Sequence, residues 1–338
     1  MKNLFGLDLA ELESELSGEK KFRSKQIAEW IYLKNVRDFE SMSNLPKNFR
    51  SKLSENFSID RAEMISKLES KDQLTTKFLL RFSDGVAIET VAMKHDYGNS
   101  VCISSQAGCS MGCKFCASTL KGIERNLTAG EMLDQVLFVK EFFDGKLDSL
   151  VVMGSGEPLL NFDNLTKFLR MLHDLVGMSY RSMTVSTSGI IPRIHDLMKE
   201  NFPITLSISL HAPLDDLRSE LMPINKKFPL RDLIETGKIY ADQTGRRVTY
   251  EYILIENLND SPEIAGILAK LLKNQLASVN LIPINPVLER GFKRPSRERI
   301  EAFARILNSR GITATIRKEM GADINAACGQ LRNKFLDK

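Results

Sequence analysis

Three cysteines at short spacing are the strongest chemical signal in this 338-residue chain. Cys109, Cys113 and Cys116 lie in CSMGCKFC, a C-x3-C-x2-C pattern. Cysteine thiolates hold iron–sulfur clusters, and three of them in one loop can ligate three irons of a cubane and leave the fourth iron open. An open iron can bind the amino and carboxylate groups of S-adenosylmethionine (SAM), and one electron passed to its sulfonium would release a 5′-deoxyadenosyl radical. We therefore predict a 4Fe–4S cluster and radical chemistry.

A structural zinc ion is the alternative for this loop. Structural zinc takes four ligands in closed tetrahedral geometry, so Cys102 would have to be the fourth. Zinc patterns usually contain two well-separated C-x2-C pairs, whereas this chain has one. The C-x3-C-x2-C spacing ahead of an α/β barrel instead matches the signature of the radical SAM superfamily.

The other two cysteines are Cys102, which precedes this loop, and Cys328, in GADINAACGQL. An odd number of cysteines in a cytosolic protein argues against a disulfide scaffold. Free cysteines are commonly small buried hydrophobes. A thiol that follows the last strand and folds back over the barrel mouth could instead act as a nucleophile or a methyl carrier.

Polar residues follow most of the other predicted strands at the point where each ends. The residues at these strand ends are Gly156 and Glu157 after the second strand, Ser186 near the end of the third, Ser209, Leu210 and His211 at the end of the fourth, and Asn285 after the sixth. Each alone is weak, because small polar residues end many strands and a single histidine is more often structural. Chemistry in β/α barrels sits at the C-terminal ends of the strands, so the series on one face predicts a ligand site, where glycines would permit close backbone approach.

The elements that position these residues alternate along the chain. Strand-like runs occur at 101–106, 149–154, 182–188, 204–212, 248–255, 278–284 and 312–317. Helical runs lie between most of them, the clearest being TAGEMLDQVLFVKEFF, where Thr128 and Glu131 form a capping box. Such alternation with right-handed crossovers gives a parallel sheet. The predicted fold class is α/β, a partial (β/α)6-type barrel with a small N-terminal helical domain.

Three regions follow from these patterns. Residues 1–60 read as amphipathic helices, 61–98 as a β-hairpin connection with its turn at Ser83-Asp84-Gly85, and 99–338 as the barrel with a C-terminal segment that carries Cys328. In the helical region, Arg23, Lys25, Gln26 and Trp30 would suit RNA phosphates and stacking. A solvated helix face with Trp30 in the core explains them equally well.

Composition limits the class of protein. Hydrophobic residues make up 43% and charged residues 27%, which favours a folded chain over a disordered one. No apolar run approaches the ~18 residues of a membrane span, and the N-terminus lacks signal-peptide features, so we expect a cytoplasmic protein with no membrane partner. The net charge of +4 says little, whereas basic runs at 20–26, 47–52 and 289–299 suggest contact with nucleic acid.

Taken together, the motifs resemble the RlmN/Cfr family of radical RNA methyltransferases. The resemblance covers nearly the whole chain and is carried by FRSKQIAEWIY, AIETVAM, VCISSQAGCSMGCKFCAS, MGSGEPLLN, STSGIIP, SLHAP, MPINKKF, NLIPINP and AACGQL. It implies a radical SAM barrel, a 4Fe–4S cluster on the three clustered cysteines, and two molecules of SAM per turnover.

The resemblance also implies a role for each candidate residue. The contacts to SAM would come from Gly156, Glu157, Ser186, Ser209, Leu210, His211 and Asn285. Cys328 would accept a methyl group and become S-methylcysteine, and a radical formed on that methyl would add to adenine. Glu89 would accept the adenine proton, although an isolated glutamate in a strand usually faces solvent and Cys102 could take the proton instead. Cys102 would then attack the Cys328 sulfur and leave a transient disulfide.

The substrates implied by the resemblance are 23S rRNA, at an adenosine of the peptidyl transferase centre, and tRNA, at the adenosine 3′ of the anticodon. An electron donor such as flavodoxin or ferredoxin is also implied. RlmN types methylate carbon 2 of adenine and Cfr types carbon 8. Pro158 favours the RlmN type because Cfr types tend to carry alanine there, while Ser155 departs from the usual methionine. A non-catalytic, zinc-stabilised RNA-binding protein is the remote alternative, and it leaves Cys328 unexplained.

Overall fold

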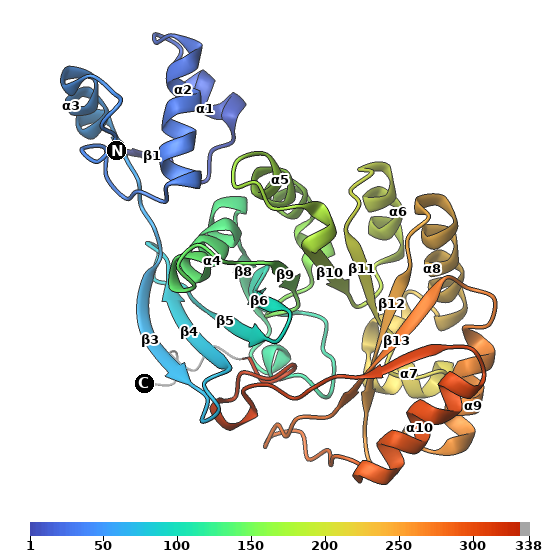
Figure 1. Cartoon of the computed structure of the whole chain (residues 1–338). Helices are drawn as coiled ribbons and strands as arrows, with labels where there is room; N and C mark the ends of the chain where they lie inside the picture. Colours follow the sequence, from blue (N-terminus) through green and yellow to red (C-terminus); the bar gives the residue numbers. More distant parts are fainter. Residues whose placement is uncertain (332–338) are drawn as a thin grey trace.

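The computed structural model describes residues 1–331, and its centre is a curved ten-stranded sheet (Figure 1). The parallel strands are β6 (Gly98–Ile103), β9 (Ser149–Val152), β10 (Met183–Thr187), β11 (Thr205–Ser209), β12 (Val248–Leu254), β13 (Ala277–Pro283) and β14 (Thr313–Ile316). They lie side by side in chain order. Within the described residues β14 forms one edge of the sheet and β3 the other, so the barrel is partial. The α/β prediction is confirmed, and each predicted strand has its counterpart.

Antiparallel strands extend the sheet beyond β6. They are β3 (Glu63–Glu69), β4 (Thr75–Arg81) and β5 (Ala87–His95). The predicted hairpin between β4 and β5 is present, with Arg81 opposite Ala87 across the turn. β5 also pairs with β6, so this hairpin belongs to the main sheet. The sequence did not predict β3, because its side chains are mostly polar and exposed and show no apolar alternation.

Helices cover the outer face of the parallel strands (Figure 1). They are α4 (Ala129–Phe142), α5 (Phe162–Asp174), α6 (Ile191–Lys199), α7 (Asp215–Leu221), α8 (Leu230–Thr244), α9 (Pro262–Leu271) and α10 (Arg297–Ser309). The predicted capping box of α4 is confirmed: the Glu131 N–H donates to Thr128 Oγ1 at 3.1 Å, and the Thr128 N–H donates to Glu131 Oε2 at 2.8 Å. The helices α6 and α7 were not predicted, and α7 spans only seven residues, about two turns.

Short elements connect the main strands and helices. A small antiparallel sheet pairs β7 (Gln106–Gly108) with β8 (Ile123–Asn126). Single 3₁₀ turns are η2 (Ala117–Thr119), η3 (Pro158–Asn161), η4 (Tyr180–Ser182), η5 (Pro223–Lys226) and η6 (Ala322–Ile324).

The N-terminal helices form a unit that projects from the barrel (Figure 1). Its elements are β1 (Lys2–Asn3), α1 (Leu9–Glu15), α2 (Lys21–Ala28), the π-helix η1 (Glu29–Leu33), α3 (Lys47–Asn56) and β2 (Phe57–Ser58). A buried ion pair ties the end of this unit to α4, with Arg61 Nε 2.6 Å from Asp134 Oδ1. Among residues 1–331, no helix is long and apolar enough to cross a membrane.

Candidate active site

The loop that carries the three clustered cysteines lies between β7 and η2 and is held by hydrogen bonds at both ends. The Cys109 N–H donates to the Gly122 carbonyl at 2.9 Å, and Arg290 Nη2 donates to the Cys116 carbonyl at 3.1 Å. Burial raises the pKa of each of these thiols, that of Cys109 to about 11, and the neighbouring thiols raise that of Cys113 further. Bound iron reverses this, because a coordinating thiol loses its proton.

The donor set of this loop fits a cubane cluster. Among residues 1–331, no three His, Cys, Asp or Glu side chains lie close enough to surround a single metal ion. A zinc ion needs its ligands around one centre, whereas the thiolates of a cubane bind separate irons. Three thiols in one short loop thus suit a cubane, in which each would bind a different iron. When bound, the cluster would supply one electron for cleavage of SAM.

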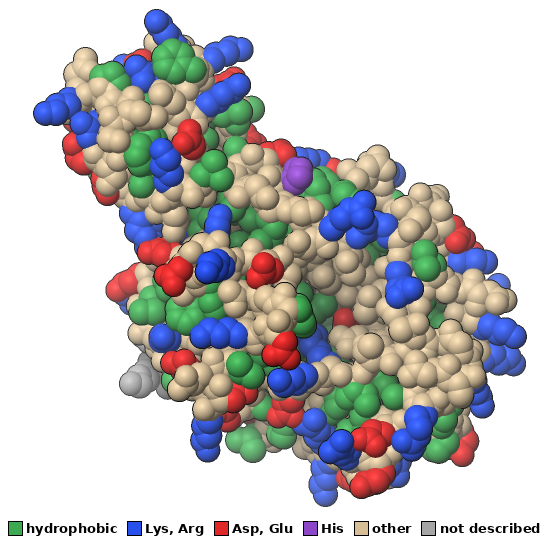
Figure 2. All heavy atoms as spheres, in the orientation of Figure 1, with side chains coloured by type: hydrophobic (Ala, Val, Ile, Leu, Met, Phe, Trp, Pro, Cys, Tyr) green, Lys and Arg blue, Asp and Glu red, His purple; other side chains and the backbone are tan. Residues whose placement is uncertain are grey.

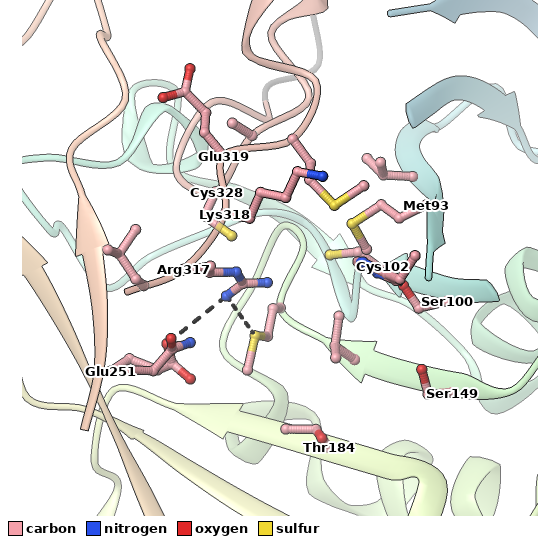
Figure 3. A pocket seen from close by; sticks show the side chains of 18 of the residues that line it. Met93, Ser100, Cys102, Ser149, Thr184, Glu251, Arg317, Lys318, Glu319 and Cys328 are labelled. Atoms are coloured by element: carbon pink, nitrogen blue, oxygen red, sulfur yellow. Dashed lines mark hydrogen bonds and ion pairs between the residues drawn. The ribbon is translucent and has the colours of Figure 1, made fainter. Parts of the chain in front are cut away.

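A cavity of about 670 Å³ fills the interior of the partial barrel, beside the segment that follows β14. Cys102, Cys328 and Asn285 all line this cavity, and Figure 3 shows both thiols facing it. Cys102 is part of β6, while Cys328 lies in the chain that returns over the barrel after η6. The structure therefore brings together two cysteines that are 226 positions apart in the sequence.

A buried cation lies near these two thiols. Arg317 follows β14, and its Nη1 is 3.9 Å from Glu251 Oε2 and 3.7 Å from Met153 Sδ (Figure 3). The neighbouring Cys328 raises the pKa of Arg317 most, burial lowers it, and Glu251 raises it further. Burial raises the pKa of the Cys102 thiol to about 12, and Arg317 counteracts this. Arg317 thus offsets part of the cost that burial imposes on a Cys102 thiolate.

Glu157 lies between β9 and η3, directly before the first residue of η3, and is almost fully buried. Its carboxylate accepts hydrogen bonds from Thr187 Oγ1 at 2.8 Å, the Ser188 N–H at 2.6 Å and the Leu159 N–H at 3.0 Å. Burial raises the pKa of Glu157, and these donors counteract it. The carboxylate is thus oriented by the ends of β9 and β10.

The structure gives a packing reason for the glycine at position 156, which the sequence did not reveal. Its φ is +106°, and a Cβ there would come within 2.6 Å of the Gln106 side chain. The glycine therefore allows the end of β9 to pack against β7. We expected it to permit close approach of a ligand, and the structure accounts for it by this packing.

His211 is held in one orientation at the end of β11. Its φ is +61°, its Nδ1 accepts a hydrogen bond from the Ile253 N–H at 3.0 Å, and its ring lies edge-on to Phe115 at 4.7 Å. Burial, reinforced by the charge of Arg218, lowers its pKa to about 3. The imidazole is therefore neutral, and because Nδ1 is an acceptor its proton sits on Nε2. Phe115 lies between Cys113 and Cys116, so this contact joins the histidine to the cysteine loop.

The other strand-end residues face the same region. Thr184 and Ser207 line the cavity, and side chains two apart on a strand share a face, so Ser186 and Ser209 point inward closer to the strand ends. Leu210 is fully buried, and its carbonyl accepts from Arg218 Nε at 3.2 Å.

Asn285 provides a direct test of whether a polar ligand fits. Its Nδ2 donates to the Cys328 carbonyl at 3.1 Å, while its Oδ1 is buried without a hydrogen-bond partner among the described residues. An unpaired buried acceptor costs on the order of 1–3 kcal/mol. A ligand that carries donors, such as the amino or hydroxyl groups of SAM, would satisfy it, so the residues present fit SAM.

Glu89 on β5 is buried, with 9% of its side chain exposed. The expectation that a lone glutamate in a strand faces solvent is therefore wrong here. Glu89 Oε1 lies 2.8 Å from Lys77 Nζ, and its main-chain carbonyl accepts from Ser104 Oγ at 2.9 Å.

Comparison with known proteins decides the family. Residues 2–59 match the family described as "Ribosomal RNA large subunit methyltransferase N-terminal domain", and residues 103–266 match the "Radical SAM superfamily". A "Probable dual-specificity RNA methyltransferase RlmN" from Symbiobacterium thermophilum is 49% identical over 97% of this chain and 89% of its own. Another of that name, from Lachnoclostridium phytofermentans, is 48% identical over 98% of this chain and 94% of its own.

The chain belongs to the RlmN family of radical SAM RNA methyltransferases. The crystal structure of a radical SAM methyltransferase from Sphaerobacter thermophilus has a TM-score of 0.94 and 44% identity, and the match covers 98% of this chain and 99% of that one. As a member of the RlmN family, the chain is an enzyme whose cofactors are a 4Fe–4S cluster and SAM.

Four charged residues of this RlmN-family site were not predicted from the sequence: Lys77, Arg218, Glu251 and Arg317. Two of them carried a usable signal. Glu251 is a single acid inside the apolar strand run VTYEYIL, and Arg317 ends the last strand, where the strand-end rule applies. Arg218 lies on a short helix and carried no such signal.

Proposed function

We propose that this chain methylates carbon 2 of adenosine in 23S rRNA and in tRNA, through S-methylation of Cys328 and a transient Cys102–Cys328 disulfide. The observation that carries the proposal is that both thiols line one cavity with Arg317 near them. The Cys328 segment is also bonded to the end of the cysteine loop, where the Ala117 N–H donates to the Gly329 carbonyl at 2.8 Å. A methyltransferase that passed the methyl group directly from SAM would not need two further thiols at its site.

The target carbon explains why two thiols are needed. Carbon 2 of adenine is an electron-poor aromatic C–H and is not nucleophilic, so it does not attack a sulfonium. A carbon radical reverses the polarity and attacks the ring. A methylene tethered to Cys328 then has to be released from sulfur, and thiol–disulfide exchange with a second thiol performs that release.

Each residue has a defined part in this proposal. The Cys328 thiolate takes a methyl group from SAM, and the radical that the cofactors supply removes one hydrogen atom from it. After the methylene has joined the adenine ring, Glu89 accepts the proton of the ring carbon, and the unpaired electron left on the ring would return to the oxidised cluster. Cys102 attacks the Cys328 sulfur, which frees the methylated base and leaves the disulfide to be reduced. An electron donor such as flavodoxin or ferredoxin would serve the cluster.

The choice of carbon 2 over carbon 8 rests on Pro158 and on the RlmN relatives. Pro158 is buried and begins η3, and the preceding residue Glu157 is extended with φ −104°. Proline fixes its own φ and restricts the residue before it. We infer that this fixes the angle of SAM, and hence of the Cys328 methylene, over the purine, where a shift on the order of 1 Å decides whether atoms can react.

The curated relatives are described as dual-specificity RNA methyltransferases, which supports RNA substrates of two kinds. We infer that the N-terminal unit (residues 1–60) recognises the RNA. Lys and Arg side chains gather over it in Figure 2. Trp30 is half-buried against the core with the Lys34 ammonium 3.7 Å from its ring centroid, while Phe22 is 48% exposed beside Arg23. Phe22 is thus better placed to stack on a base than Trp30. RNA substrates and five free thiols support a cytoplasmic location.

The test is to trap the tethered intermediate. In a Cys102→Ala variant the resolving thiol is gone, so RNA should remain covalently attached at Cys328. The measurement is mass spectrometry of the Cys328 peptide after digestion with nuclease. Wild-type protein should carry one added methyl group on the same peptide, and Cys328→Ala should yield neither the methyl group nor the adduct. Normal turnover by Cys102→Ala without any adduct would rule out the two-cysteine mechanism.

A further inference from the structure

Lys77 occupies a position between two parts of the site that the sequence separates widely. On β4 it lies opposite Val91 of β5, and Glu89 is the diagonal neighbour on the same face. Val91 lines the cavity and stands opposite Cys102 of β6. The Lys77 and Glu89 side chains therefore share the face of the sheet that carries Cys102.

The Lys77 ammonium makes two contacts on this face. Its Nζ lies 2.8 Å from Glu89 Oε1 and donates to the main-chain carbonyl of Asn325 at 3.0 Å. The Lys77 and Glu89 side chains are each only 9% exposed. A buried charge without a partner is costly, so the Lys77 and Glu89 side chains stabilise each other at this buried position.

Asn325 belongs to the segment that carries Cys328. Its φ is +51°, at the end of the turn η6 and three residues before Cys328. Near η6 the Lys71 N–H donates to Asp323 Oδ2 at 2.9 Å, and further on the Ala117 N–H donates to the Gly329 carbonyl at 2.8 Å. Of these three contacts to the Cys328 segment, only that of Lys77 comes from a side chain that also contacts Glu89.

We propose that Lys77 is a positioning residue that orients the Glu89 carboxylate as the proton acceptor and sets its distance from the Cys328 segment. This rests on the proposed function, since Glu89 has that role only there. One ammonium group thereby joins the base to the methyl-carrying cysteine. Loss of Lys77 should slow the step in which the ring proton is removed and leave the earlier methylation of Cys328 in place.

The experiment compares Lys77→Met, Lys77→Arg and a matched control, Lys67→Met, on the neighbouring strand, where the side chain is 41% exposed. Lys77→Met should be methylated on Cys328 like the wild type yet form methyladenosine about 100-fold more slowly, the scale of general-base catalysis. RNA should accumulate as an adduct at Cys328 although Cys102 is present. Lys77→Arg, which keeps the charge, should recover most of the rate, and Lys67→Met should not change it.

Two further readouts separate this role from a structural one. RNA with deuterium at carbon 2 of the target adenosine should react more slowly in Lys77→Met, because proton removal has become rate-limiting. In a Glu89→Gln background, Lys77→Met should add little, since residues that act through one another are not additive. An unchanged rate in Lys77→Met, or additive losses without adduct or isotope effect, would overturn the proposal. A wild-type enzyme without methyl on Cys328 would overturn the proposed function instead.

Discussion

His211 shows how burial sets the chemistry of a single residue. Its pKa falls to about 3 in the folded protein, from an ordinary value of 6.5. Below pH 6.5 the unfolded chain takes up a proton on this histidine and the folded chain does not. Stability that is present above pH 6.5 is therefore lost as the pH falls toward 3, on the order of 3 kcal/mol by pH 4.

We predict that His211→Gln makes the acid limb of the stability curve shallower. The variant has no group at this position to titrate. Between pH 4 and 6, the slope of its free energy of unfolding against pH should therefore be smaller than that of the wild type by the equivalent of about one proton. Denaturant unfolding at several pH values measures this, with His195→Gln on α6 as the control. Identical slopes for the wild type and His211→Gln would contradict the assignment of a neutral, buried imidazole.

For single residues, the sequence indicated the candidate site residues but not the side chains and main-chain groups that contact them. The cysteine pattern and the strand-end rule selected residues that the structure brings to one face. Their partners came from other parts of the chain: Lys77 reaches Glu89 across a diagonal of the sheet, and Asn285 bonds to the main chain of Cys328. Such contacts depend on the register of the strands and on the path of the final segment back over the barrel. Neither can be read from the spacing of residues in the sequence.

Among the elements, α7 contacts the strand ends through one side chain, Arg218. Arg218 is fully buried, and its guanidinium donates to the carbonyls of Ser188 at 2.8 Å, Ser209 at 3.0 Å and Leu210 at 3.2 Å. Its Nη1 donates to Asn225 Oδ1 at 2.7 Å. One residue thus joins the chain after β10 to the end of β11.

Replacement of Arg218 by methionine should leave these buried carbonyls without a donor. We predict a loss of about 3 kcal/mol in the free energy of unfolding and weaker binding of SAM. Denaturant unfolding and equilibrium dialysis with SAM measure the two effects. The matched control is Arg231→Met at the exposed start of α8, which should change neither. A loss in Arg218→Met no larger than that of the control would contradict this account.

The sequence predicted helices and strands correctly wherever their hydrophobic pattern extended over many residues. The parallel strands read as apolar runs because helices bury their outer face, and α4 had both its period and its capping box. The polar edge strand β3 lacks these signals. The helix α2 was predicted to continue through Trp30, and the structure continues it as the π-helix η1, a change of backbone pitch that side-chain type does not reveal.

For the whole molecule, the proposal that the projecting N-terminal unit recognises RNA can be tested on its exposed lysines. Exposed lysines in this unit include Lys20, Lys21 and Lys25. Replacement of these three by glutamate should weaken RNA binding and lower the slope of affinity against salt by up to about 3. Methylation of Cys328, which needs no RNA, should be unchanged.

The control for this prediction is Lys270→Glu with Lys273→Glu, at the end of α9 on the barrel. This change alters the net charge in the same direction at a distance from the N-terminal unit. Binding titrations at several salt concentrations measure both variants. Equal losses of RNA affinity in the two would mean that overall charge, and not this unit, governs the contact.

The central claim is radical transfer of a Cys328-bound methyl group to carbon 2 of adenine. The most direct measurement incubates the reduced enzyme with SAM carrying a deuterated methyl group and unmodified 23S rRNA or tRNA, followed by digestion and mass analysis of the nucleosides. We predict 2-methyladenosine from both RNAs, with two of the three original methyl deuterons retained and the third found in 5′-deoxyadenosine. Retention of all three would contradict the radical mechanism, and 8-methyladenosine as the product would contradict the choice of carbon 2.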